Sequence, residues 1–261
     1  MVQRAQKLIS KYKFSTLAGD QIPGPDISVI IPAGGEERIP LVQRMLTNIA
    51  AQNYTTIKPI LAEYGLNGTR VFDWFPHQHV YIEGGELFNK SKAMNAGIMA
   101  ATSDICVVLD ADMLIPDGFF DLVISSISGY DACFLLKRIL HCTELDVKHH
   151  KLPHIESIRD DNFNGGSIAI TKSAYIRIGG MCEDFEGYGY EDVEFWDRLR
   201  QLTTLNEKRE LDLLHLPHGH VEGYDQHWLA NQHLWSALQG ENPSARADRF
   251  RQALEKYIQV T

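Results

Sequence analysis

The chain has 261 residues, 44% of them hydrophobic, and its 34 acidic and 25 basic residues give a formal net charge of −9. A chain of this length can bury a full core and fits one large domain or two small ones, of which we favour one. The acidic balance argues against a nucleic-acid backbone as the main partner, because proteins that bind one usually carry a basic face. A phosphate ligand stays possible, since a small anion needs only a local basic spot or a bound metal.

The N-terminal residues and the cysteines bear on the cellular compartment. Residues 1–14 alternate charged and apolar side chains, unlike the apolar block of a signal peptide, and no apolar run reaches transmembrane length. We therefore expect a cytoplasmic protein without an integral membrane segment. The cysteines lie far apart, which predicts buried free thiols in place of disulfides or a zinc site: Cys106, Cys133, Cys142 and Cys182.

The chain divides into three predicted parts. Residues 1–25 are expected to form a short amphipathic helix and a linker rich in glycine and proline. A single domain is expected over 26–240, with a nucleotide-binding half over 26–115 and an acceptor half over 116–240. A closing helix is expected within 241–261.

Within that domain, apolar runs of strand length alternate with stretches of helical periodicity. The alternation predicts an α/β fold with a mostly parallel sheet and crossover helices, whose ligands lie beyond the carboxyl ends of the strands. The polar stretch 141–161 has no clear period and is typical of a functional lid. The expected strands cover 27–31, 57–62, 80–82, 105–109, 132–136, 167–170 and 211–216, and the expected helices 41–49, 92–101, 119–127, 191–202 and 244–258.

Polar residues follow three of the predicted strands. Gly34-Gly35-Glu36-Glu37-Arg38 comes after the first strand, Glu63-Tyr64-Gly65 after the second and Asp110-Ala111-Asp112 after the fourth. The two aspartates are two residues apart, so both carboxylates can point the same way. Carboxylate oxygens suit Mg²⁺ or Mn²⁺, which bridge a protein to phosphate oxygens of a substrate. The alternative is a pair of acids that only meets solvent.

Three histidines, His215, His218 and His220, end a late predicted strand. Imidazole is a common ligand of transition metals, and a set that mixes Asp with His favours Mn²⁺ over Mg²⁺. We expect His215 or His218, ahead of His220, to bind the metal. The alternative is that the three residues cap a strand and bind nothing.

The segment Asn89-Lys90-Ser91-Lys92 stands before a predicted helix. Backbone N–H groups and the positive end of the helix dipole receive anions at that position, so the two lysines could meet a diphosphate. The equally weighted alternative is a solvated basic start of a helix.

The segment from Gly187 to Asp192 places two glycines and two tyrosines directly before a pair of acids and a helix. Glycine lets a backbone approach a ligand, tyrosine offers a flat face, and carboxylates at a helix start tend to stay ionised. Asp192 is therefore the candidate general base, with Glu191 beside it.

Three segments in this order resemble glycosyltransferases of the GT-A fold, most of all the β-1,4-galactosyltransferase family and its bacterial and polypeptide N-acetylgalactosaminyltransferase-like relatives. They are LFNKSKAMNAGIMAA, VVLDADMLIP and FNGGSIAITKSAYIRIGGMCEDFEGYGYEDVEFWDRL. The resemblance runs from about residue 27 to residue 220. It implies a Rossmann-like, mostly parallel twisted sheet flanked by helices, with a smaller sheet on the acceptor side.

The resemblance also implies roles for single residues on the donor side. Asp112 would be the direct metal ligand together with His215 or His218, and Asp110 would lie near the ribose. Lys90 stands where the family has an arginine, in a Phe-Asn-Arg-x-Lys segment. The residues implied to bind the nucleotide sugar are Pro32, Arg38, Glu63, Asn89, Lys92, Asp110, Ala111, Gly165 and Gly166.

On the acceptor side, Tyr188 takes the place of a tryptophan that covers the acceptor, and Gly189 and Tyr190 follow it. Asp192 matches the base of inverting members, and Glu191 matches the acid that holds the hydroxyl groups of the donor sugar. The family's first loop has arginines directly after its proline, whereas this chain reaches Arg38 only after two acids.

The sequence therefore predicts a metal-dependent inverting enzyme of polysaccharide biosynthesis. It would move galactose or N-acetylgalactosamine from a UDP-sugar to a saccharide hydroxyl, with Mn²⁺ or Mg²⁺ as cofactor. A sugar nucleotidyltransferase is the alternative enzyme class, because IIPAGGEERIP superficially resembles the glycine-rich loop of such enzymes. A non-catalytic sugar-binding homologue is the third possibility.

Overall fold

The computed structural model describes residues 24–52, 54, 56–66, 68, 70–143, 155–159, 165–219 and 224–258. The predicted N-terminal helix, His220 and most of the predicted lid lie outside these residues. Within the described ranges, no helix is both long and apolar enough to cross a membrane. All four cysteines are buried free thiols, as the sequence predicts.

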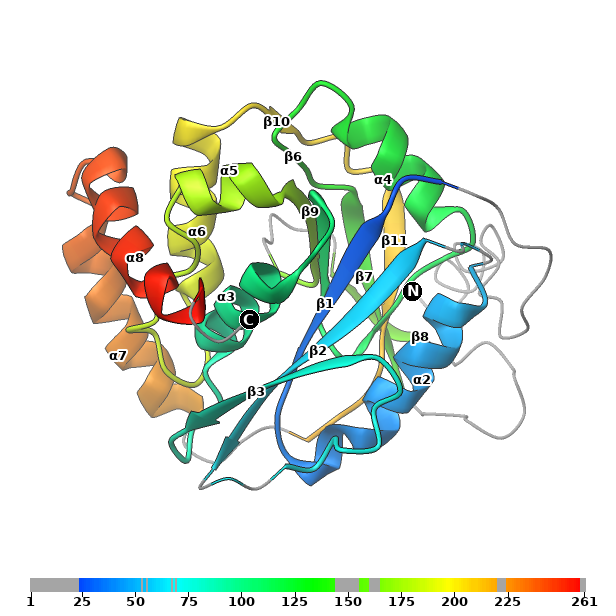
Figure 1. Cartoon of the computed structure of the whole chain (residues 1–261). Helices are drawn as coiled ribbons and strands as arrows, with labels where there is room; N and C mark the ends of the chain where they lie inside the picture. The colour runs from blue at the N-terminus through cyan, green and yellow to red at the C-terminus, as the bar shows by residue number, and fades with distance from the viewer. Residues whose placement is uncertain are drawn as a thin grey trace.

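A seven-stranded sheet forms the centre of the molecule (Figure 1). Its strand order is β10-β6-β9-β4-β1-β2-β3, and β9 alone runs against its neighbours β4 and β6. Every residue of β1 is buried, which explains why this strand reads as an unbroken apolar run. The strands are β1 Ile27–Ala33, β2 Ile57–Leu66, β3 Gln78–Gly84, β4 Ile105–Leu109, β6 Ala132–Cys133, β9 Ser167–Thr171 and β10 Leu205–Asn206.

Helices cover the sheet. Helix α3 crosses β1 and β2 closely at Gly97, where a Cβ atom would come within 2.6 Å of Ile30 Cγ2. The C-terminal helix α8 packs on α3, α5 and α6. The helices are the 3-10 turn η1 Glu36–Arg38, α2 Ile39–Ala50, α3 Lys90–Ala100, α4 Phe119–Ile127, α5 Lys172–Arg177, α6 Glu191–Leu202, α7 Tyr224–Leu238 and α8 Pro243–Ile258.

A second sheet of four strands has the order β5-β11-β7-β8. Its strands are β5 Met113–Leu114, β7 Leu136–Cys142, β8 Ile155–Arg159 and β11 Leu211–His215. The chain leaves β4 of the large sheet, passes through Asp110-Ala111-Asp112 and enters β5, which pairs with β11. Met113 lies opposite His215 in this pairing, so the sheet switch brings the aspartates next to the late histidines.

The structure differs from the sequence prediction in several places. Strands β5, β8 and β10 have no counterpart in the prediction, and β8 lies within the stretch 141–161 that was predicted to be a lid. The predicted strand 132–136 is two strands, β6 and β7, which belong to different sheets. Strand β2 continues to Leu66, so Glu63 lies inside a strand and not after it. Helices α5 and α7 have no counterpart in the prediction, because neither carries a clear apolar stripe.

Candidate functional site

A cleft of about 910 Å³ lies at the carboxyl ends of β1 and β4, between the two sheets and the start of α6. Most of the predicted site residues line it, whereas Glu63, Asn89 and Lys92 are not part of its lining. The predicted residues that line the cleft are Pro32, Arg38, Asp110, Ala111, Asp112, Gly165, Gly166, Tyr188, Gly189, Tyr190, Glu191, Asp192, His215 and His218.

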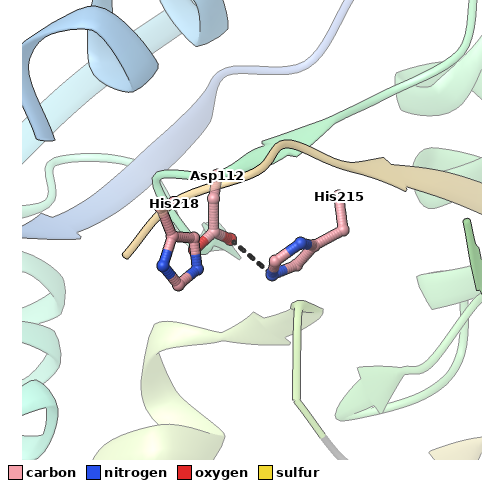
Figure 2. Close-up of side chains that lie close together, drawn as sticks. All are labelled: Asp112, His215 and His218. Carbon is pink, nitrogen blue, oxygen red and sulfur yellow. Dashed lines mark ion pairs between the residues drawn. The ribbon is translucent and has the colours of Figure 1, made fainter. Parts of the chain in front are cut away.

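Asp112, His215 and His218 form a candidate metal site (Figure 2). One ligand atom of each residue lies within 4.8 Å of the others. The Nε2 atom of His218 is 3.0 Å from Asp112 Oδ2, and the Nε2 atom of His215 is 3.9 Å from Asp112 Oδ1. One carboxylate and two imidazoles are a donor set that fits a divalent transition metal, and they are the three ligands that the sequence predicts.

The charges of this triad also fit a cation. Burial opposes the charge of Asp112, but its hydrogen bond with His218 and the charges of His215 and Arg38 lower its pKa to about 2. Burial lowers the pKa of His215, which favours the neutral imidazole that a metal binds. Arg38 Nη1 lies 3.1 Å from Asp112 Oδ2, so this arginine belongs to the same polar cluster.

Lys90 connects the metal side of the cleft to the predicted base. Its ammonium lies 3.0 Å from Asp110 Oδ1 and 3.3 Å from Asp192 Oδ2. Burial opposes the charge of Lys90, but Asp110, Asp192 and Glu191 together raise its pKa well above the usual value. Of the two lysines at the start of α3, Lys90 is therefore the one that contacts the acids of the cleft. Its match to the family's arginine was the feature of the sequence that could have indicated this.

Glu191 and Asp192 are the first two residues of α6 and line the same cleft as the metal triad. Burial and the neighbouring Asp192 raise the pKa of Glu191 to about 7. Burial also raises the pKa of Asp192, and the nearby Lys90 limits that rise. The helix dipole alone therefore does not decide the charge of this pair, because burial acts against it.

Two glycines hold the donor side of the cleft close to these acids. A Cβ atom at Gly165 would come within 2.9 Å of Asp192 Oδ2. Gly166 has a φ of +95°, and its N–H donates to Asp110 Oδ2 at 3.1 Å. Pairing of β4 with β9 brings Gly166 to Asp110, because the backbone N–H of Asp110 also donates to the Gly166 carbonyl at 3.1 Å.

The three predicted donor-binding residues outside the lining have other partners, and for Lys92 this is the Tyr64 ring, whose centroid lies 6.0 Å from the ammonium. Glu63 is 1% exposed; its carboxylate accepts from Val71 N–H at 2.7 Å and lies 2.7 Å from His79 Nε2. Asn89 caps α3, accepting from Lys92 N–H at 2.9 Å, and its amide donates to the carbonyl groups of residues 183 and 185. These residues shape the cleft from outside its lining.

The structure adds cleft residues that sequence reasoning missed. Among them are His141, Arg159, His227 and Trp228. His141 stacks near the metal triad, with its ring centroid 4.6 Å from that of His215. Strands β7 and β8 and helix α7 supply these residues, and no motif in these segments marked them.

Comparison with known proteins agrees with this geometry. Residues 149–215 match the family model described as the N-terminal domain of galactosyltransferase. The chain is also 30% identical over 142 residues to beta-1,4-galactosyltransferase 5 of Homo sapiens, and equally to its namesake from Mus musculus. Each match covers 52% of this chain and 33% of the relative, so the chain spans about a third of the length of these curated relatives.

Two solved structures share the architecture. The mannosyltransferase PcManGT from Pyrobaculum calidifontis, in complex with GDP-Man and Mn²⁺, has a TM-score of 0.55 and 18% identity, covering 99% of this chain and 78% of that chain. GalNAc-T7 with UDP, GalNAc and Mn²⁺ has a TM-score of 0.54 and 12% identity, covering 88% of this chain and 54% of that chain. The GT-A fold and the resemblance to GT-A galactosyltransferases predicted from the sequence are confirmed, and together these comparisons support a glycosyltransferase.

Proposed function

We propose that this chain is a metal-dependent inverting glycosyltransferase that moves a hexose from a UDP-sugar to a hydroxyl group of a saccharide acceptor. The observation that carries the proposal is the division of one cleft. Its metal-type triad contains Asp112, its paired acids are Glu191 and Asp192, and Lys90 lies between Asp192 and Asp110, which is two residues before Asp112. A diphosphate leaving group needs the cation that the triad would bind, and an acceptor hydroxyl needs the base that the paired acids would supply.

The metal half would hold the nucleotide diphosphate. Asp112, His215 and His218 would bind Mn²⁺, which the mixed carboxylate and imidazole set favours over Mg²⁺. A bound divalent cation supplies stabilisation of the negative charge that develops on the departing diphosphate. Arg38 adds a fixed positive charge on the same side of the cleft.

Asp192 would act as the general base. Its carboxylate accepts the proton of the acceptor hydroxyl as the acceptor oxygen forms a bond to the anomeric carbon. The bond from that carbon to the phosphate oxygen breaks, and its electron pair leaves with UDP. Attack from the side opposite the leaving group inverts the anomeric carbon. Gly165 and Gly166 leave room for the donor sugar beside Asp192 and Asp110.

Lys90 would keep the base ionised. A carboxylate buried among other acids tends to take up a proton, and an ammonium 3.3 Å away opposes this. Glu191, whose pKa of about 7 leaves it partly protonated near neutral pH, can donate or accept a hydrogen bond with the donor sugar hydroxyls.

Galactose and N-acetylgalactosamine are the proposed donor sugars. The sequence matches to galactosyltransferases support them, and GalNAc-T7 bound to UDP, GalNAc and Mn²⁺ has the same fold. The nucleotidyltransferase alternative fits the cleft less well, because the carboxylate of Glu37 folds over Gly35, where a triphosphate would need a cation.

The test incubates the protein and Mn²⁺ with UDP-galactose, UDP-N-acetylgalactosamine, UDP-glucose and GDP-mannose, with and without saccharide acceptors. We expect UDP release from a UDP-sugar, a product of inverted anomeric configuration by NMR, and loss of transfer in Asp192→Asn. Asp248→Asn, at an exposed position on α8, is the matched control. Release of pyrophosphate from a nucleoside triphosphate and a sugar phosphate, without UDP-sugar turnover, would contradict the proposal.

A further inference from the structure

Helix α7 contributes aromatic side chains to the wall of the cleft. His227 and Trp228 line the cavity, and 36% of the Trp228 surface is exposed there. Helix α7 follows the segment 149–215 that matches the galactosyltransferase model, and none of its residues belongs to the predicted site. In Figure 1 the helix lies beside α8, next to the start of α6.

The two glycines of the Gly-Tyr-Gly-Tyr segment accommodate this helix. A Cβ atom at Gly187 would come within 3.0 Å of His227 Cγ, and one at Gly189 within 2.9 Å of Trp228 Cδ1. Both glycines also have positive φ values, +70° and +101°. Two consecutive residues of α7 therefore pack against two positions where a side chain is excluded.

Hydrogen bonds and ring contacts fix the arrangement. Asn231 is 5% exposed, and its amide donates to the carbonyl of Glu186 at 2.9 Å and to that of Tyr188 at 3.1 Å. The Trp228 ring lies 5.3 Å from the Tyr190 ring. Helix α7 is thus attached to the loop that carries Tyr188, and the indole is held beside the residues that precede Asp192.

The indole retains free binding capacity. Among the described residues, no acceptor lies within hydrogen-bond distance of Trp228 Nε1. An indole that is partly exposed can pack against the apolar face of a pyranose ring. Its N–H, when it makes no hydrogen bond within the protein, can donate to one of the hydroxyl groups of the sugar. Tyr188 is 46% exposed and lines the same cleft.

We propose that Trp228 determines acceptor binding: its indole forms the aromatic face of the acceptor subsite and binds a neutral pyranose residue together with Tyr188. This inference rests on the proposed glycosyl transfer, and it names the surface on which that reaction's acceptor lies. Helix α7 then supplies the tryptophan of this acceptor subsite.

The test uses the full chain saturated with Mn²⁺ and UDP, titrated with N-acetylglucosamine, glucose and xylobiose while tryptophan fluorescence is recorded. Wild-type protein should show saturable binding of at least one saccharide. Trp228→Ala should weaken that binding, and raise the acceptor KM, by about 10-fold. Trp228→Phe, which keeps a ring, should lose about 3-fold or less, and the donor KM should stay within 2-fold of wild type in both variants. Leu229→Ala is the matched control, since Leu229 is the exposed next residue of α7 and does not line the cleft.

Thermal unfolding of each variant separates binding from folding. Equal acceptor affinity in wild type and a folded Trp228→Ala variant would overturn the inference, as would the absence of saccharide binding to wild type. Donor hydrolysis by wild type distinguishes the two levels. If wild type hydrolyses UDP-sugars but Trp228→Ala binds acceptors as wild type does, only the role of Trp228 in acceptor binding is contradicted. If wild type neither binds nor hydrolyses any UDP-sugar, the proposed function itself is contradicted.

Discussion

The two halves of the cleft are built in different ways. The metal half needs one strand end and one strand pairing, because β5 and β11 bring Asp112 next to His215. The acceptor half needs the start of α6, the Gly-Tyr-Gly-Tyr segment before it and one face of α7. The polar residues that follow a strand can be read from the sequence, whereas the pairing of Leu114 with Leu214 and the packing of α7 on a loop both depend on the whole fold.

The two halves of the cleft also differ in the direction in which the pKa of a buried acid is shifted. Asp112 is buried, yet His218, His215 and Arg38 lower its pKa to about 2. Glu191 has Asp192 beside it and Lys90 as a nearby cation, and its pKa rises to about 7. Burial acts on both acids, so the number of cationic partners decides the outcome. Four substitutions test this contrast.

Asp112→Asn should have the largest effect. It removes the carboxylate of the metal triad, so Mn²⁺-dependent turnover should fall by about 100-fold or more. Isothermal titration with Mn²⁺ should show lost or much weaker binding, whereas Asp248→Asn should bind as wild type does. Unchanged Mn²⁺ affinity would remove Asp112 from the metal site.

Lys90→Met should lower kcat by about 10-fold to 30-fold through the neighbouring base. Loss of the ammonium raises the pKa of Asp192, so the acid limb of the pH profile of kcat/KM should move to higher pH. Lys90→Arg should restore most of the activity and the pH profile. A uniform loss at every pH would mean that Lys90 binds the diphosphate without acting on Asp192.

Glu191→Gln should change the pH dependence of stability. The folded protein raises the pKa of this acid from 4.5 to about 7, so its contribution is fully present below pH 4.5 and is lost as the pH rises through 7. The variant should therefore be more stable than wild type at pH 8, by on the order of 1 to 3 kcal/mol, and nearly equal at pH 4. Urea unfolding at both pH values measures this difference, with the exposed Glu255→Gln as control.

Glu63→Gln should have the smallest effect on catalysis. Its carboxylate is engaged by His79 and Val71 outside the cleft lining, so the donor KM and kcat should stay within about 2-fold of wild type. The free energy of unfolding should fall by about 1 to 3 kcal/mol, because the buried partners lose a charged acceptor. A large rise in the donor KM at unchanged stability would return Glu63 to the nucleotide site.

The sequence predicted the fold class, and the structure brings together Asp112, His215 and His218, which the sequence marks as candidate metal ligands. Buried apolar runs marked β1 and β4, and the polar groups at the strand ends marked Asp112 and the late histidines. The choice between the two lysines was harder, because Lys90 and Lys92 both lie in the first turn of α3 and only the three-dimensional contact of Lys90 with Asp110 and Asp192 separates them.

The acceptor half was only partly predictable. Tyr188 and Asp192 stand in a recognisable motif, but Trp228 comes from a helix of weak amphipathicity that binds the motif through Asn231. The sequence also predicts Glu63 at a strand end, beside the nucleotide sugar. Strand β2 continues four residues beyond its apolar run, so Glu63 lies inside the sheet.

The separation of the two halves is tested most directly by the stabilisation that UDP and Mn²⁺ together give to wild type, Asp192→Asn and Asp112→Asn. Ligand that binds the folded state at 100 times its Kd adds about 2.7 kcal/mol to the stability. We predict equal Tm increases for wild type and Asp192→Asn, no increase for Asp112→Asn, and no transfer by either variant. Loss of the UDP-dependent increase in Asp192→Asn would contradict the division of the cleft into a nucleotide half and a base half.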